Sequence, residues 1–100
     1  MKKVEIEIQY FEGCPNSEEM LRRVREAVRH FDGEYSYKET LVDSYTKAKS
    51  VRFRGSPTLL INNADFENTD APDEPGMNCR VYRTGLPSED EIVNKITSAS

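Results

Sequence analysis

Glu12-Gly13-Cys14-Pro15-Asn16-Ser17 joins an apolar strand to a helix, and the rest of the predicted fold is arranged around this junction. Pro15 suits the first helical position, where its missing N–H costs no hydrogen bond. Cys14 then lies at the helix N-terminus, where free backbone N–H groups and the positive end of the helix dipole favour a thiolate. We therefore expect Cys14 to be a nucleophile. The alternative is a small buried side chain, which is what most unpaired cysteines are.

An alternating strand precedes this junction and an amphipathic helix follows it. Apolar side chains alternate with Glu5, Glu7 and Gln9 over residues 4–10, which predicts a strand with one buried face. After Pro15, apolar residues recur at helical spacing, and Gly33 is expected to end the helix. The apolar positions of this helix are Met20, Leu21, Val24, Ala27, Val28 and Phe31.

The remaining elements complete a mixed sheet. We predict strands at residues 35–42, 58–61 and 79–83, a short helix from Asp43 or Ser44 to about Ser50, an acidic loop insertion at residues 62–78, and a last helix that begins with the capping box Ser88-Glu89-Asp90-Glu91. The order is βαβαββα, in which the first two strands are parallel and the last two antiparallel. The predicted fold class is α/β, with a four-stranded mixed sheet and helices on both faces.

The composition indicates one soluble domain. A chain of 100 residues forms one hydrophobic core, so residues 1–100 are assigned to a single domain. Hydrophobic residues make up 36%, charged residues make up 32% and the net charge is -4. No run approaches the roughly 18 apolar residues of a membrane span, and the alternation after Met1-Lys2-Lys3 is unlike a signal peptide. We expect a cytoplasmic protein that contacts no membrane.

Two kinds of site are not expected. The single histidine, His30, falls near the end of the predicted helix, where a surface or capping role is expected, and the two cysteines lack metal-clip spacing, so no metal site is predicted. The acidic balance, without a basic stripe that interleaves aromatic residues, argues against binding of nucleic acid. The sequence indicates no oligomeric state.

The predicted order, a cysteine at the first helix and a proline that opens the third strand resemble the thioredoxin-like fold superfamily. More narrowly, the chain resembles small bacterial thioredoxin-like proteins that are loosely related to alkylmercury lyases. Three stretches carry this resemblance: Tyr10-Phe11-Glu12-Gly13-Cys14-Pro15, Gly55-Ser56-Pro57-Thr58 and Cys79-Arg80-Val81-Tyr82. The resemblance implies that Cys14 is the attacking cysteine, that Pro57 is a cis-proline beside it, and that the backbone of Ser56 pairs with an extended substrate segment.

Two positions depart from the thioredoxin pattern. Ser17 stands where thioredoxin has its second cysteine, so it would hydrogen-bond a thiolate, and no disulfide forms within this motif. Ile8 stands where the family has a buried acid that shuttles a proton. The resemblance therefore implies a monothiol oxidoreductase, in which Cys14 attacks a protein or small-molecule disulfide and glutathione or another thiol releases the mixed disulfide. No other cofactor is expected.

The expected site combines three catalytic residues with three substrate-binding residues. The catalytic residues are Cys14, Ser17 and Pro57, and the substrate-binding residues are Pro15, Ser56 and Arg54. Arg54, three residues before Pro57, would favour the thiolate of Cys14. Glu12, Glu18 and Glu19 would oppose it, so the two sets of charges counteract each other.

Cys79 is the second thiol of the chain. If it begins a strand that pairs with residues 58–61, it lies about 15 Å from Cys14, at roughly 3.3 Å per residue. A disulfide needs Cα atoms within about 7 Å, so Cys79 is then a buried core residue. The two thiols meet only if the loop of residues 62–78 folds back or the last strand starts later, and Cys79 is then a resolving thiol.

Two other functions compete with thiol–disulfide exchange. A binding module without turnover would capture a soft metal ion or an organomercurial through Cys14, together with Cys79 if the two are close. A structural or dimerising domain is the third reading, because the polar strand face of Glu5, Glu7 and Gln9 and the short second helix leave one side of the sheet thinly covered.

Overall fold

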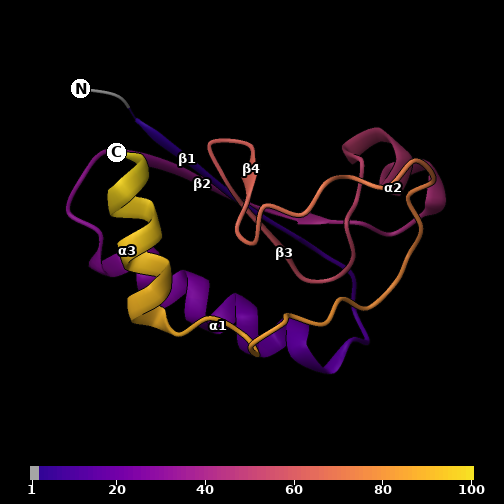
Figure 1. Ribbon diagram of the computed structural model, residues 1–100, viewed down its shortest axis with the longest axis horizontal. Helices are drawn as coiled ribbons and strands as arrows, with labels where there is room; N and C mark the ends of the chain where they lie inside the picture. The colour runs from indigo at the N-terminus through magenta and orange to yellow at the C-terminus, as the bar shows by residue number, and fades with distance from the viewer. Residues whose placement is uncertain (1–2) are drawn as a thin grey trace.

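A four-stranded mixed sheet forms the centre of the computed structural model, which describes residues 3–100 (Figure 1). Met1 and Lys2, considered above, lie outside the described residues. The strands are β1 (Val4–Tyr10), β2 (Tyr35–Leu41), β3 (Thr58–Ile61) and β4 (Ala64–Asp65), in the sheet order β2-β1-β3-β4. β1 is parallel to β2 and antiparallel to β3, and β4 is antiparallel to β3. The predicted mixed α/β sheet is confirmed.

Two helices pack on one face of this sheet. They are α1 (Pro15–His30) and α3 (Glu89–Ala99), which lie together on the same side of the strands in Figure 1. The capping box of Ser88 and Glu91 is present at the start of α3, as predicted. α1 ends earlier than expected, with Phe31 rather than Gly33 as its C-cap. The main core lies between these helices and the sheet and contains Val4, Ile6, Ile8, Met20, Leu21, Val24, Ala27, Val28, Leu59, Ile61, Tyr82, Ile92 and Ile96.

The third helix lies at one end of the molecule. α2 (Tyr45–Val51) begins at Ser44, whose hydroxyl accepts a hydrogen bond from Lys47 N–H as its predicted N-cap. α2 packs in a second, smaller core of Val42, Ala48 and Phe53, to the right of the main core in Figure 1.

The second face of the sheet carries polar side chains at a cavity of about 570 Å³, which α2 borders only at one end through Val51. The prediction of helices on both faces is therefore wrong for most of this second face. The cavity is lined by Glu7, Gln9, Lys38, Val51, Arg52, Arg54, Leu60, Asn63, Asp70 and Ala71.

The fourth strand is Ala64–Asp65, so the prediction of a strand at residues 79–83 is wrong. Asn62 and Asn63 both have positive φ angles, of 53° and 65°, and form a two-residue turn that reverses the chain directly after β3. Consecutive residues with positive φ are typical of tight hairpin turns, in which asparagine is favoured. The edge of β3 is therefore filled by the next residues along the chain, which were predicted as part of an acidic loop.

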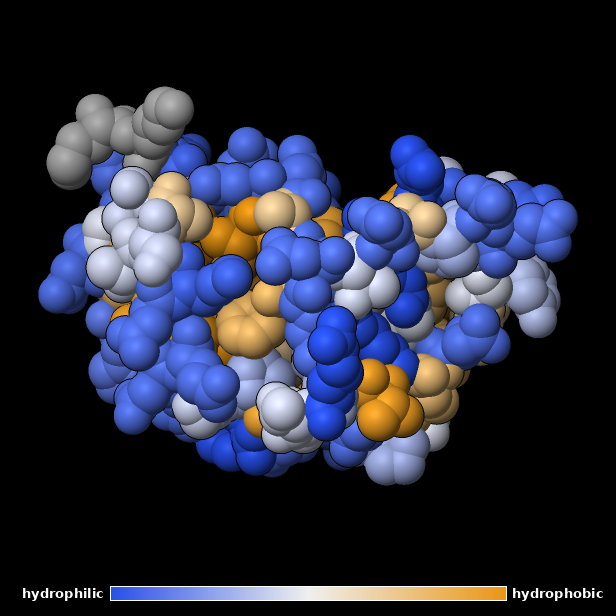
Figure 2. All heavy atoms as spheres, in the orientation of Figure 1, coloured by the Kyte–Doolittle hydropathy of each residue, from blue (hydrophilic) through white to orange (hydrophobic). Residues whose placement is uncertain are grey.

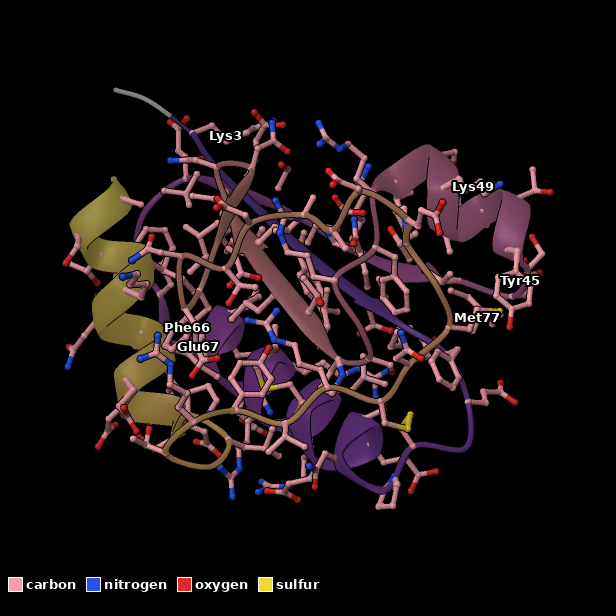
Figure 3. The ribbon with its side chains drawn as sticks, turned by 45° about the vertical axis from the view of Figure 1, so that its right-hand side comes forward. Lys3, Tyr45, Lys49, Phe66, Glu67 and Met77 are labelled. Atoms are coloured by element: carbon pink, nitrogen blue, oxygen red, sulfur yellow. A yellow bond between two sulfur atoms is a disulfide. The ribbon has the colours of Figure 1, made fainter. Side chains whose placement is uncertain are left out.

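Residues 79–83 instead pack back across the start of β3. Ser56 and Cys79 form an isolated parallel bridge, and burial alternates along the segment, with Arg80 and Tyr82 buried and Cys79, Val81 and Arg83 exposed. Phe66, which follows β4, lies against α3 (Figure 3), where Lys95 Nζ is 5.7 Å from the centre of its ring. The loop after β4 is thus attached to the rest of the fold at several points.

The face drawn in Figure 2 is mostly polar. Apolar side chains appear there in small separate groups with hydrophilic residues between them. Within residues 3–100, no helix combines the length and the apolar character that a membrane span requires.

Candidate functional site

A disulfide bond joins Cys14 to Cys79. The two Sγ atoms are 2.07 Å apart and the two Cα atoms 5.8 Å apart. The expected separation of about 15 Å is wrong because it placed Cys79 opposite the far end of β3, a position that β4 occupies. Of the two alternatives left open for Cys79, the loop that folds back is the one found. The yellow bond near the start of α1 in Figure 3 is this disulfide.

Cys14 occupies the junction predicted for it. It is the N-cap residue of α1, Pro15 follows within the first turn, and Cys14 itself is 4% exposed. Its carbonyl oxygen accepts a hydrogen bond from Ser17 N–H at 3.1 Å. The sulfur thus belongs to a residue at the positive end of the helix dipole, an environment that stabilises a thiolate when the disulfide opens.

The proline turn lies directly against the Cys79 segment. The Ser56–Pro57 peptide bond is cis, as predicted. Ser56 N–H donates to Asn78 O, and Ser56 O accepts from Arg80 N–H, both at 2.8 Å. The predicted role of Ser56 was to pair its backbone with a substrate. Both of its backbone groups are instead bound by the chain's own residues on either side of Cys79.

Ser17 contacts the proline turn through its side chain. Its Oγ lies 2.6 Å from Ser56 Oγ, and both residues are buried. Ser56 Oγ also accepts a hydrogen bond from Phe11 N–H at 3.0 Å. The hydroxyl of Ser17, expected to bond the thiolate, therefore bonds a second hydroxyl that links the junction before α1 to the turn before β3.

Arg80, which is not among the predicted site residues, anchors the Cys79 segment from within the protein. Its Nη1 and Nη2 donate to Asp65 Oδ1 at 2.6 Å and Oδ2 at 2.7 Å. Its side chain is 6% exposed and that of Asp65 is 1% exposed. Weaker bonds reach Thr58 Oγ1 at 3.2 Å and Thr69 Oγ1 at 3.3 Å. No local signal marks this pair, because it forms only once the hairpin of β3 and β4 has placed Asp65.

The same anchor sets the charge states of its members. Burial alone raises the pKa of Asp65, but hydrogen bonds from Arg80 and from the backbone N–H groups of Thr69 and Glu67 outweigh it, so the pKa is lowered. Burial also opposes the charge of Arg80, and its hydrogen bonds to Asp65 raise its pKa overall. The pair is therefore ionised, as a buried bidentate pair should be.

Tyr82 ties the anchor to the proline turn. Its hydroxyl donates to Pro57 O at 2.8 Å, and the guanidinium carbon of Arg80 lies 4.6 Å from the centre of its ring. Burial raises the pKa of Tyr82 to about 12, so the hydroxyl keeps its proton and remains a donor. Cys79 is consequently held by contacts on both sides that do not involve its sulfur.

Arg54 is not brought to the cysteines. Its Nε donates to Thr69 O at 2.8 Å, and its side chain lines the cavity on the second face of the sheet rather than the one at Cys14. The expectation that Arg54 stabilises the Cys14 thiolate is therefore not met by this geometry. His30 lies at the other end of α1, where its Nδ1 is 2.9 Å from Glu26 O, as expected of a surface residue.

A cavity of about 770 Å³ opens in front of Cys14. Its apolar walls come from Tyr10, Phe11 and Leu21, and Pro15, predicted to contact substrate, also lines it. The complete lining is Tyr10, Phe11, Glu12, Gly13, Cys14, Pro15, Ser17, Glu18, Leu21 and Arg25. A small molecule in this cavity would approach the disulfide from the side of Cys14.

The two sulfur atoms of Cys14 and Cys79 can exchange with an external thiol. Among residues 3–100, no group of three or more histidine, cysteine or acidic side chains is placed to hold a metal ion.

Comparison of the sequence with protein-family models and with curated proteins gives no match.

Proposed function

We propose that the protein is a thiol–disulfide oxidoreductase that uses Cys14 and Cys79 as a reversible pair. The observation that carries this proposal is the Cys14–Cys79 bond itself, placed at the N-terminus of α1 beside the cis-Pro57 turn. A thiolate is favoured at a helix N-terminus, and a low leaving-group pKa speeds exchange. The strand order and these two motifs also support a relationship with the thioredoxin-like superfamily, which stays a proposal.

The proposed reaction has two exchange steps. In the reduced protein the Cys14 thiolate attacks one sulfur of a substrate disulfide, which forms a mixed disulfide and expels the first substrate thiolate. The Cys79 thiolate then attacks Cys14 Sγ, which forms the Cys14–Cys79 bond and expels the second thiolate. The protein dithiol is oxidised, the substrate disulfide is reduced, and solvent protonates both released thiolates. An external thiol runs the same steps backwards and regenerates the dithiol.

This proposal replaces the monothiol mechanism because a second thiol is held at the site. Ser17 cannot resolve a mixed disulfide, whereas Cys79 lies within disulfide distance of Cys14. Disulfides of cytosolic proteins are usually transient and belong to catalysis or redox sensing. A cytoplasmic location, which stays a prediction, would therefore agree with an exchanging pair.

The decisive experiment follows the reaction of the reduced protein with bis(2-hydroxyethyl) disulfide by mass spectrometry. We expect the natural sequence to release two thiols and to end as the Cys14–Cys79 disulfide. Cys79→Ser should stop as a mixed disulfide that carries one 2-hydroxyethylthio group on Cys14, and Cys14→Ser should react much more slowly than either. If Cys14→Ser consumes the disulfide as fast as the natural sequence, the proposal is wrong.

Capture of a soft metal ion or an organomercurial is the second candidate function. It is favoured by the same proximity, because two cysteines with Cα atoms 5.8 Å apart can offer two thiolates to one ion once they are reduced. Titration of the reduced protein with mercury(II) or copper(I) should then saturate at one ion per chain and require both cysteines. Equal binding by Cys79→Ser would contradict a two-thiolate site.

A further inference from the structure

The cavity in front of Cys14 carries more negative than positive charge. Glu12 and Glu18 line it, are exposed, and form no ion pair with any of the residues 3–100. Arg25 is the only cationic residue in the lining, and its guanidinium is bound to Glu39 through Nε at 2.6 Å and Nη2 at 2.8 Å. The charge that Arg25 brings to the cavity is thus offset by its partner, while the two carboxylates are not offset.

The helix dipole does not reverse this balance. The N-terminus of α1 is equivalent to roughly half a positive charge, against two full negative charges from Glu12 and Glu18. Glu18 lies in the first turn of α1, where its carboxylate itself compensates the dipole. A charged group that enters the cavity therefore meets a net negative field close to Cys14.

Apolar surface completes the recognition surface of this cavity. Tyr10, Phe11 and Leu21 form walls next to the two carboxylates. Such a combination suits a molecule with a short apolar stem and a cationic end, because the stem is removed from water while the charge is attracted.

We propose that the substrates of the Cys14–Cys79 pair are disulfides that carry positive charge on short apolar stems, and that Glu12 and Glu18 determine this specificity. The inference rests on the proposed oxidoreductase function. It disfavours glutathione, which the sequence suggested as the releasing thiol, because glutathione has a net negative charge. A cationic or neutral thiol is the expected reductant.

The test compares three small disulfides of different charge. Reduced protein is mixed with cystamine, bis(2-hydroxyethyl) disulfide or dithiodiglycolate, and the appearance of the Cys14–Cys79 disulfide is timed. Each rate is divided by the rate at which free 2-mercaptoethanol attacks the same disulfide, which removes differences in intrinsic reactivity. We expect the normalised rate to be highest for cystamine, lower for the neutral disulfide and lowest for the dianion. Successive rates should differ roughly fivefold at low ionic strength, and these differences should shrink in about 0.5 M salt.

Matched variants assign the effect to the cavity. Glu12→Gln and Glu18→Gln should each lower the cystamine-to-neutral rate ratio about twofold to fivefold. Glu34→Gln changes the net charge equally, but Glu34 directly precedes β2 and lies outside this cavity, so the cystamine-to-neutral rate ratio of this variant should match that of the natural sequence. The proposed specificity would be overturned if the three disulfides had equal normalised rates. It would also be overturned if Glu34→Gln lowered the cystamine-to-neutral rate ratio as much as Glu12→Gln and Glu18→Gln do. Either result would leave the oxidoreductase function intact. Failure of all three disulfides to oxidise the pair would overturn both.

Discussion

Ser56 and Cys79 are bridge partners, although 23 positions of the chain separate them, which is the difference between their residue numbers. The backbone of Ser56 is bound on both sides, to Asn78 O and to Arg80 N–H, so Cys79 is centred on the residue before Pro57. Cys14 lies across from this position at the N-terminus of α1. The disulfide therefore joins two segments that both contact Ser56. The Cys79 segment binds its backbone, and the junction at the start of α1 binds its hydroxyl through Phe11 and Ser17.

Gly55 permits this close pairing. A Cβ atom at Gly55 would lie 2.9 Å from Arg80 Cβ and 3.3 Å from Asn78 O, and its φ is +108°. Gly55→Ala should displace the Cys79 segment and lower the fraction of protein that forms the disulfide in a glutathione buffer, because overpacking adds about 1–3 kcal/mol to the cost of positive φ. Mass spectrometry after acid quenching measures this fraction.

Gly85→Ala is the control for Gly55→Ala. Gly85 also has a positive φ, of +84°, but a Cβ atom there meets nothing within 4 Å. It should therefore show the backbone strain without the displacement. If both variants form the disulfide to the same extent, contact between residue 55 and the Cys79 segment does not position the thiol.

The disulfide should contribute strongly to stability. It closes a loop with a sequence separation of 65 residues, and loop-closure entropy gives about 4 kcal/mol for a loop of this size. The free energy of unfolding of the natural sequence, measured with a denaturant, should therefore be lower by this order of magnitude when a reductant is present. Cys79→Ser should unfold like the reduced protein and should be insensitive to the reductant; a large reductant effect in this variant would assign the difference to another cause.

The parts of the fold that depend on local pattern were predictable. The alternation in Val4–Tyr10, Pro15 at the start of α1 and the capping box at Ser88 are each read from adjacent residues, and each is found. The parts that failed depend on contacts between distant residues. The turn at Asn62 and Asn63 was missed as a hairpin signal, and this one error moved the last strand to residues 79–83 and so separated the cysteines.

The candidate site was predictable to the same degree. Cys14 and Pro57 were identified from the motifs around them, and the structure brings Ser17, Ser56 and Cys79 to the same place. Arg54 was assigned to the site because it is close to Pro57 along the sequence. The chain turns at Gly55, however, and the Arg54 side chain points to the cavity on the second face of the sheet instead. Arg80 was missed because arginine side chains are mostly exposed, and only the folded structure shows that Asp65 lies beside this one.

The hydroxyls of Ser17 and Ser56 should be energetically coupled. Ser56→Ala leaves the buried Ser17 hydroxyl and Phe11 N–H without the partner seen here, which should lower the free energy of unfolding by about 1–3 kcal/mol. Ser17→Ala should lower the free energy of unfolding less than Ser56→Ala does, because Ser56 Oγ keeps its hydrogen bond from Phe11 N–H. The double variant should be more stable than the sum of the single effects implies. Strict additivity in urea unfolding would show that the 2.6 Å contact carries no coupling.

Asp65→Asn should change both the stability and its dependence on pH. The substitution leaves the buried charge of Arg80 without its bidentate partner, which typically lowers the free energy of unfolding by on the order of 3 kcal/mol.

The pKa of Asp65 in the folded protein is lowered from 3.8, so its stabilising effect is complete above that value and is lost as the pH falls through the folded pKa. The difference between the natural sequence and Asp65→Asn should therefore be constant near neutral pH and should narrow only in acid. Urea unfolding across this range measures it, with Asp73→Asn, an exposed acid in the loop after β4, as the control. A difference that narrows instead as the pH rises would contradict an ionised Asp65 in the folded protein.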